Sequence, residues 1–170
     1  SRSYELGVSW DATNYSIGLS AYKTEIDNII IWREVAPYVW NAFNVEKAKI
    51  EGVELSYGVS TEMFDLAAEL AYTDAWNDIE DRQLAKRPRT SAKINISKNI
   101  GKFDISLDAK RIGESYEYDN SGNTNVNAAY FVIGGVFRYN ASKKVSYALK
   151  AENISNADYS TTYGYSSPGC

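Results

Sequence analysis

Histidine is absent from the 170 residues, and cysteine and methionine each occur once. Without histidine the chain cannot form a Ser-His-Asp triad, a Cys-His pair or an imidazole metal site. The single cysteine, Cys170, can form neither an internal disulfide nor a thiolate zinc site. These absences exclude most hydrolase mechanisms. We expect a protein that is not an enzyme, with no catalytic residue and no cofactor, calcium on the loops being the one alternative and considered below.

The chain also lacks a long hydrophobic run. The longest candidate, residues 29–32 (IIIW), is far shorter than the ~18 consecutive apolar residues that a membrane-spanning helix needs. The first residues, SRSYE, do not have the basic, apolar and small-residue order of a signal peptide. The net charge of -4 argues against a phosphate-binding surface, so we expect no nucleic-acid partner.

What the sequence does contain is an alternation of apolar and polar residues with a period of two, together with 14 Tyr and 4 Trp. Successive side chains of a strand point to opposite faces, so this alternation predicts β-strands with one apolar face. Such segments occur near residues 4–11, 16–21, 53–60, 64–73, 92–97, 103–110, 130–139 and 145–152. The predicted fold class is therefore all-β.

The connections between these segments alternate in length. Short connections are expected at 12–14, 60–63, 98–102 and 140–144, and long ones at 33–44, 74–88, 113–127 and from 154 onward. Outer-membrane barrels have short periplasmic turns and long extracellular loops. The pattern predicts an antiparallel meander of about eight strands in a transmembrane β-barrel. The alternative is a soluble β-sandwich whose apolar faces form the core.

Three segments carry more specific motifs. Residues 44–54 (NVEKAKIEGVE) contain Gly52 at the point where the alternation changes phase, which suits a bulge or a close backbone approach. Residues 86–89 (KRPR) open a strand with a proline at its start, where the missing N–H breaks no ladder hydrogen bond. Residues 153–169 (NISNADYSTTYGYSSPG) leave the last strand through a polar loop rich in tyrosine and glycine.

These three motifs, in this order, resemble the C-terminal part of the barrel of TonB-dependent outer-membrane receptors. That family has a strand with Lys/Arg-Ala-x-x-x-Gly-Val/Leu-Glu, a strand opened by Arg-Pro, and a tail ending in Gly-Tyr-x-x-Pro-Gly-Arg. The resemblance extends over residues 44–169. Within the family, residues 111–119 (RIGESYEYD) and 159–165 (YSTTYGY) are most similar to cobalamin (vitamin B12) transporters.

The resemblance implies that residues 1–170 are a partial receptor barrel domain, a fragment of a larger transmembrane β-barrel. Barrels of this class have about 22 strands around a plugged lumen. The closing strand is expected to be absent, because the chain stops at Pro168-Gly169-Cys170, where the family has Pro-Gly-Arg and a further strand. The plug and the earlier strands of the family are also expected to be absent from these residues.

The function implied by the resemblance is outer-membrane uptake of a metal chelate such as cobalamin or a ferric siderophore. The expected partners are the extracellular chelate, outer-membrane lipid and the periplasmic TonB energy-coupling protein of the full-length parent. The alternative function is that of a self-contained eight-stranded outer-membrane barrel with an adhesin or structural role.

Two sets of residues are candidates for function. Aromatic side chains on the long connections could stack on a large ligand, or could pack within their own loops; they are Trp32, Tyr38, Trp40, Tyr116 and Tyr118. The polar faces of the strands would line the lumen, and these positions include Glu54, Glu69, Lys93, Asp104, Asp108 and Lys150.

Two acidic stretches place several oxygen ligands on long connections, as calcium binding requires. They are residues 74–81, with four acidic side chains, and residues 119–125 (DNSGNTN). Neither matches the twelve-position calcium-loop pattern. Calcium binding and a simple hydrated acidic loop both remain open at these two places, and the hydrated loop is the preferred interpretation.

Overall fold

The computed structural model describes the backbone of residues 1–119, 121–167 and 169, and their side chains except at 28, 29, 31, 33, 34 and 44–46. The residues that it describes form strands and connections only. Among them, no helix is long and apolar enough to cross a membrane.

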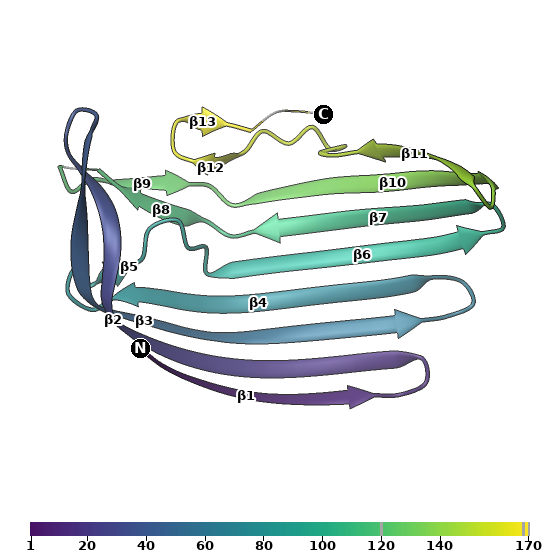
Figure 1. The fold of residues 1–170 in the computed structure, drawn as a ribbon, viewed down its shortest axis with the longest axis horizontal. Helices are drawn as coiled ribbons and strands as arrows, with labels where there is room; N and C mark the ends of the chain where they lie inside the picture. Colours follow the sequence, from purple (N-terminus) through teal and green to yellow (C-terminus); the bar gives the residue numbers. More distant parts are fainter. Residues whose placement is uncertain (120, 168, 170) are drawn as a thin grey trace.

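The strands form one antiparallel meander in which each main strand pairs with the next one along the chain (Figure 1). In order across the sheet they are β1 (Arg2–Asp11), β2 (Tyr15–Ala36), β3 (Val39–Ser60), β4 (Asp65–Asn77), β6 (Thr90–Ile100), β7 (Phe103–Ile112), β10 (Tyr130–Ser142) and β11 (Val145–Ala151). The predicted all-β meander of about eight strands is confirmed. Within the described residues β1 and β11 do not pair with each other, so the sheet stays open and does not close into an eight-stranded barrel.

The predicted short connections are confirmed, and all four lie at the same end of the sheet (Figure 1). Between the main strands they cover residues 12–14, 61–64, 101–102 and 143–144. We call this end the short-turn end. The β6–β7 turn contains Gly101 with a φ of 63°, a conformation that favours glycine because it has no Cβ.

The predicted long loop at residues 33–44 is wrong. β2 and β3 instead continue as a hairpin beyond the rest of the sheet, and only residues 37 and 38 form the turn, with a φ of 65° at Tyr38. The segments 19–36 and 38–51 contain no glycine or proline and are rich in β-branched and aromatic residues, which favour strand. We call the part of this hairpin at residues 28–47 the β2–β3 ribbon; Figure 1 shows it projecting from the sheet.

The other long connections contain short strands of their own. β5 (Arg82–Gln83) pairs with the end of β4, and β8 (Ser115–Tyr118) pairs with β9 (Thr124–Asn127). After β11, β12 (Ser160–Thr162) pairs with β13 (Tyr165–Ser166). Pro88 precedes β6 by two residues, so the Arg-Pro motif lies just before the strand and not at its first position.

One face of the sheet is apolar and exposed. Directly paired residues share a face, and the pairs Val8↔Leu19, Leu19↔Leu55 and Leu55↔Leu70 continue across four strands. Leu6 is 80% exposed and Leu149 is 70% exposed, and the buried hydrophobic side chains of the described part of the chain are only Ala48 and Ala75. A soluble sandwich would cover this face with a second sheet. The β-sandwich alternative is therefore wrong.

Gly52 lies in β3 at a close approach between strands. The pairing of β3 with β4 runs without a shift from Ala48 to Ser60, so the predicted possibility of a bulge is wrong. The close approach is confirmed: a Cβ on Gly52 would lie 2.5 Å from the Tyr22 ring and 2.8 Å from the carbonyl oxygen of Tyr72. The Tyr22 hydroxyl is 2.8 Å from the Thr73 hydroxyl, so the tyrosine spans from β2 across Gly52 to β4.

The apolar face ends at charged residues on the side of the long connections. The pairs Lys23↔Glu51 and Glu25↔Lys49 continue the face directly beyond the pair Ala21↔Val53. Lys23 Nζ lies 3.2 Å from Glu25 and 3.6 Å from Glu51, and Lys49 Nζ lies 2.7 Å from Glu51. We call these four residues the charged collar. It marks one border of the apolar band.

The other border of the band is aromatic and lies at the short-turn end. The rings of Trp10 and Tyr15 meet edge to face with centroids 5.7 Å apart. The Phe103 ring lies 5.5 Å from that of Phe137 and 5.2 Å from that of Tyr139. Aromatic side chains at the edge of an apolar band are typical of the interface between a membrane and water.

Candidate functional site

The polar face of the sheet carries all six residues predicted to face a lumen. Directly paired residues share a face, and three of the pairs are Glu69↔Lys93, Asp104↔Arg138 and Val136↔Lys150. Residues separated by an even number of positions in a strand also share a face. Asp108 therefore lies on the face of Asp104, and Glu54, which pairs with Ala71, lies on the face of Glu69. Lys93 Nζ lies 3.3 Å from Glu69 Oε2, and both side chains are exposed. The structure thus brings these six residues onto one face, opposite the apolar one.

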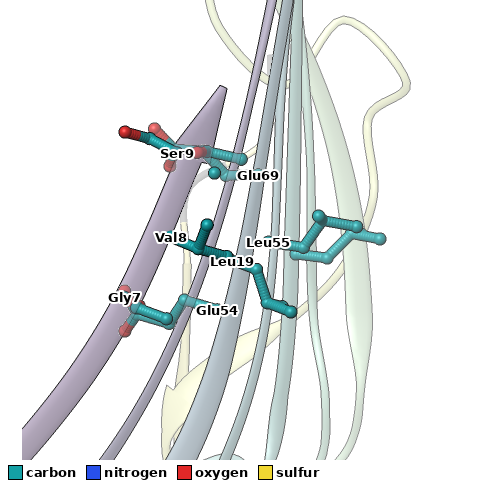
Figure 2. A pocket seen from close by; sticks show the side chains of 11 residues that line it. Gly7, Val8, Ser9, Leu19, Glu54, Leu55 and Glu69 are labelled. Atoms are coloured by element: carbon teal, nitrogen blue, oxygen red, sulfur yellow. The ribbon is translucent and has the colours of Figure 1, made fainter. Parts of the chain in front are cut away.

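A hollow of about 500 Å³ lies on this polar face over β1 to β4. Its lining includes Gly7, Ser9, Gly18 and Ser20, whose small side chains leave the space open between Glu54 and Glu69. Figure 2 shows Glu54 and Glu69 on the side of the strands opposite to Leu19 and Leu55. The lining thus combines these polar-face residues with Val8, Leu19, Leu55 and Leu70 of the same strands.

Trp32, Tyr38 and Trp40 all lie on the β2–β3 ribbon. Trp32 pairs with Ala42 and Trp40 pairs with Glu34, so the two tryptophans are diagonal neighbours on one face of the ribbon. Trp32 is 68% exposed and Trp40 is 57% exposed, while Tyr38 stands at the turn. The ribbon thus presents two large aromatic surfaces side by side.

Tyr116 and Tyr118 lie on a different hairpin, β8–β9, and their hydroxyls have partners. The Tyr118 hydroxyl donates to the carbonyl oxygen of Gln83 at 2.9 Å, and the Arg82 guanidinium lies 3.8 Å from the centre of the Tyr118 ring. The Tyr116 hydroxyl donates to Glu114 Oε1 at 2.5 Å, and this hydrogen bond raises the pKa of Tyr116. The Tyr118 contacts hold the β8–β9 hairpin against β5, and the Tyr116 hydrogen bond is local to the residues just before β8.

Sequence patterns did not single out Glu117, which joins three connections. Glu117 lies 3.4 Å from Lys86 Nζ and accepts hydrogen bonds of 2.8 Å from the Asn127 amide and from the Tyr163 backbone N–H. Partial burial raises the pKa of the Glu117 carboxyl, but these two hydrogen bonds and the charge of Lys86 outweigh burial and lower it. We call Glu117, Lys86, Asn127 and Tyr163 the loop junction.

The two acidic stretches considered for calcium have nitrogen donors on their carboxylates. The Asp119 carboxylate accepts hydrogen bonds from the backbone of Ser121 and from the backbone and side chain of Asn123. Asp74 is paired with Arg89 at 2.9 Å, and Asp81 accepts from the Trp76 indole. In the described ranges, no group of three or more Asp, Glu, Cys or His side chains is arranged to hold a metal ion.

Comparisons with known proteins give the family. The family model for the TonB-dependent receptor-like β-barrel matches residues 1–156. The chain is 30% identical over 166 residues to the vitamin B12 transporter BtuB of Photobacterium profundum, a match that covers 94% of the chain and 27% of that protein. The chain spans about a quarter of the length of the curated relatives that it matches.

Solved structures share the fold. The siderophore receptor PirA from Acinetobacter baumannii superposes with a TM-score of 0.80 at 15% identity, over 98% of this chain and 30% of its own. The copper transporter OprC superposes with a TM-score of 0.78 at 19% identity, over 93% of this chain and 26% of its own. The relatives are transporters and receptors, not enzymes. The chain belongs to the TonB-dependent receptor β-barrel family of the outer membrane.

Proposed function

We propose that the complete polypeptide containing this chain takes up a metal chelate, such as cobalamin or a ferric siderophore, across the outer membrane in a TonB-dependent manner. The observation that carries this proposal is the 30% identity to a vitamin B12 transporter over 94% of the chain. A relative named as a siderophore receptor shares the fold and widens the choice of cargo.

In this proposal the apolar face contacts lipid and the polar face lines the lumen. An exposed apolar band between the charged collar and the aromatic border suits a hydrocarbon layer, which leaves the carboxylates and ammonium groups of the opposite face for water or a plug. Glu54, Glu69, Lys93, Asp104, Asp108 and Lys150 would be part of this lumen wall.

The β2–β3 ribbon supplies the first contact with the chelate. Trp32 and Trp40 offer large, rigid apolar surfaces next to each other, and such surfaces bind bulky ligands at a low cost in side-chain entropy. Tyr38 adds a third exposed aromatic side chain at the turn of the ribbon. Tyr118 would shape the binding surface indirectly, by holding the β8–β9 hairpin against β5, and Tyr116 would do so by fixing Glu114 just before that hairpin.

The test is uptake by cells. The complete polypeptide is produced in a Gram-negative strain that lacks its own cobalamin and siderophore receptors. Accumulation of labelled cobalamin and of labelled ferric siderophores in the cells is then measured with and without the proton motive force. We expect energy-dependent accumulation of one chelate class. If the protein is present in the outer membrane and neither class accumulates above the receptor-free strain, the proposal is wrong.

A pair of variants tests the role of the ribbon. Trp32→Ala with Trp40→Ala should weaken chelate binding at the cell surface without changing the amount of protein in the membrane. Trp10→Ala is the matched control, because it removes the same side chain from the apolar face at the opposite end of the sheet. Equal loss of binding in the control would assign the effect to folding.

A further inference from the structure

Three lysines lie together at the short-turn end. Lys102 is in the β6–β7 turn, and Lys143 and Lys144 form the β10–β11 turn. The two turns are neighbours, because β7 pairs with β10 and the Asn140 N–H donates to the carbonyl oxygen of Lys102 at 2.8 Å. All three lysines are exposed. We call them the turn lysines.

The positive charge of the turn lysines is not balanced locally. Within the described part of the chain, none of the three ammonium groups forms an ion pair or a hydrogen bond. The nearest acidic residue in the pairing, Asp104, lies on the polar face and accepts hydrogen bonds from the Asn99 and Asn140 amides.

The same end of the sheet is acidic on its other half. Asp11 directly precedes the β1–β2 turn, Glu62 lies in the β3–β4 turn, and Asp65 directly follows it. Neither turn contains a lysine. Lys98 lies between the two halves, and its ammonium group donates a hydrogen bond of 2.6 Å to the carbonyl oxygen of Glu62. The cationic surface is therefore local to the β6–β7 and β10–β11 turns and is not a property of the whole rim.

The turn lysines border the aromatic edge of the apolar band. Phe103 follows Lys102 directly in the chain, and its ring contacts those of Phe137 and Tyr139 on the lipid-facing side. Lysine side chains at such a border keep their ammonium groups at the level of lipid headgroups while their methylene stems cover apolar surface. Cations placed there attract anionic lipid, with about 1 kcal/mol for each lysine, which corresponds to a change of about fivefold in binding.

We propose that the turn lysines bind the phosphate of an anionic phospholipid in the leaflet next to the short turns. The site goes beyond chelate uptake and rests on the membrane placement of the barrel, not on its cargo. Charge complementarity selects the occupant: three unpaired ammonium groups next to an aromatic border face a phosphate-bearing headgroup, and an anionic phospholipid supplies it.

The experiment measures phospholipid binding to the complete polypeptide in mixed micelles. Phosphatidylglycerol is titrated against phosphatidylcholine, and the retained lipid is counted by native mass spectrometry. The variant carries Lys102→Gln, Lys143→Gln and Lys144→Gln. The control carries Lys23→Gln, Lys47→Gln and Lys49→Gln, which removes the same charge from the opposite end of the sheet.

We expect phosphatidylglycerol binding to fall by about fivefold for each turn lysine, with phosphatidylcholine binding unchanged and the control close to wild type. Equal phosphatidylglycerol binding by variant and control would overturn the proposal. Stronger binding of lipid A than of phosphatidylglycerol to the wild-type protein would also overturn the proposal, because it would assign the turn lysines to the other leaflet. If the triple variant fails to fold, Lys143→Gln alone should still show the fivefold loss, and its absence would refute the site.

Discussion

Replacing Gly52 by alanine should destabilise the barrel even though alanine is the better residue for a regular strand. The new Cβ would lie 2.5 Å from the Tyr22 ring and 2.8 Å from the carbonyl oxygen of Tyr72. Backbone cannot move out of the way in a ladder that is paired on both sides, so Tyr22 must turn away. This would break the 2.8 Å contact between its hydroxyl and that of Thr73.

The size of the effect follows from three contributions. Overpacking of this kind costs about 1–3 kcal/mol, and loss of the hydroxyl hydrogen bond costs about 0.5–1.5 kcal/mol. The lower backbone entropy of alanine offsets about 0.5–1 kcal/mol. We expect a net loss of about 0.5–4 kcal/mol for Gly52→Ala.

Gly7 provides the control. It lies on the same polar face in β1, and a Cβ there would meet its neighbours at 3.7 Å, an ordinary contact. Gly7→Ala should therefore stabilise the protein slightly, by about 0.5 kcal/mol. The assay is unfolding of the complete polypeptide in micelles by urea, followed by heat-modifiable gel mobility.

A double-mutant cycle identifies the cause. In a Tyr22→Ala background the ring is gone and only the approach to the Tyr72 carbonyl remains, so Gly52→Ala should cost less than in the wild type. An equal cost in both backgrounds would refute the role of the Tyr22 ring and would indicate that the carbonyl oxygen of Tyr72 alone causes the strain.

Three other predictions concern the faces, the loop junction and the topology. Leu107→Arg on the apolar face should cost about 2–4 kcal/mol in lipid, and Ser106→Arg on the polar face far less, as measured by unfolding in vesicles; equal costs would contradict the assigned faces. Because the folded-state pKa of Glu117 is lowered, its stabilisation of the loop junction is present above the usual glutamate pKa of 4.5 and is lost as the pH falls through the folded pKa; protease cleavage near residue 163 should rise in that window in the wild type and be independent of pH in Glu117→Gln. Single cysteines at Asn41 and Ser121, with Cys170 replaced by serine, should react with an impermeant thiol reagent on whole cells, and one at Ser142, the last residue of β10 before its short turn, should not; the reverse pattern would invert the topology.

The sequence was sufficient to predict the eight main strands, because a single-layer sheet must have one apolar and one polar face. Alternation then assigns every residue of a strand to a side, as for Leu55 and Glu54. The close approach at Gly52 could also be predicted, since glycine in a strand often marks such a contact. The sequence could not decide between a bulge and a close approach at Gly52, because the answer depended on the position of Tyr22, which is 30 residues away in sequence.

The β2–β3 ribbon was missed because alternation fails there. The run Ile29 to Trp32 is apolar at every position, so a search for period two stops at its start. The ribbon side chains that the structure describes are all exposed, so among them no buried face imposes alternation. The better signal was the absence of glycine and proline from 19–36 and 38–51.

The loop junction could not be found from local sequence. Glu117 takes its partners from the connection before β6, from β9 and from the β12–β13 hairpin. Each of these contacts depends on how the connections fold back toward one another. No spacing of residues along the chain encodes that arrangement.

The apolar band also determines which bilayer suits this barrel. Along β4 and the residue before it, the band runs from Phe64 to Tyr72, which is about 27 Å along the strand and about 20 Å across the membrane at a tilt near 40°. Beyond it, the charged collar on the adjacent strands cannot enter hydrocarbon without losing hydration. A thick bilayer would therefore have to thin around the protein, and hydrophobic mismatch would favour membranes with short acyl chains, in keeping with the thin outer membrane.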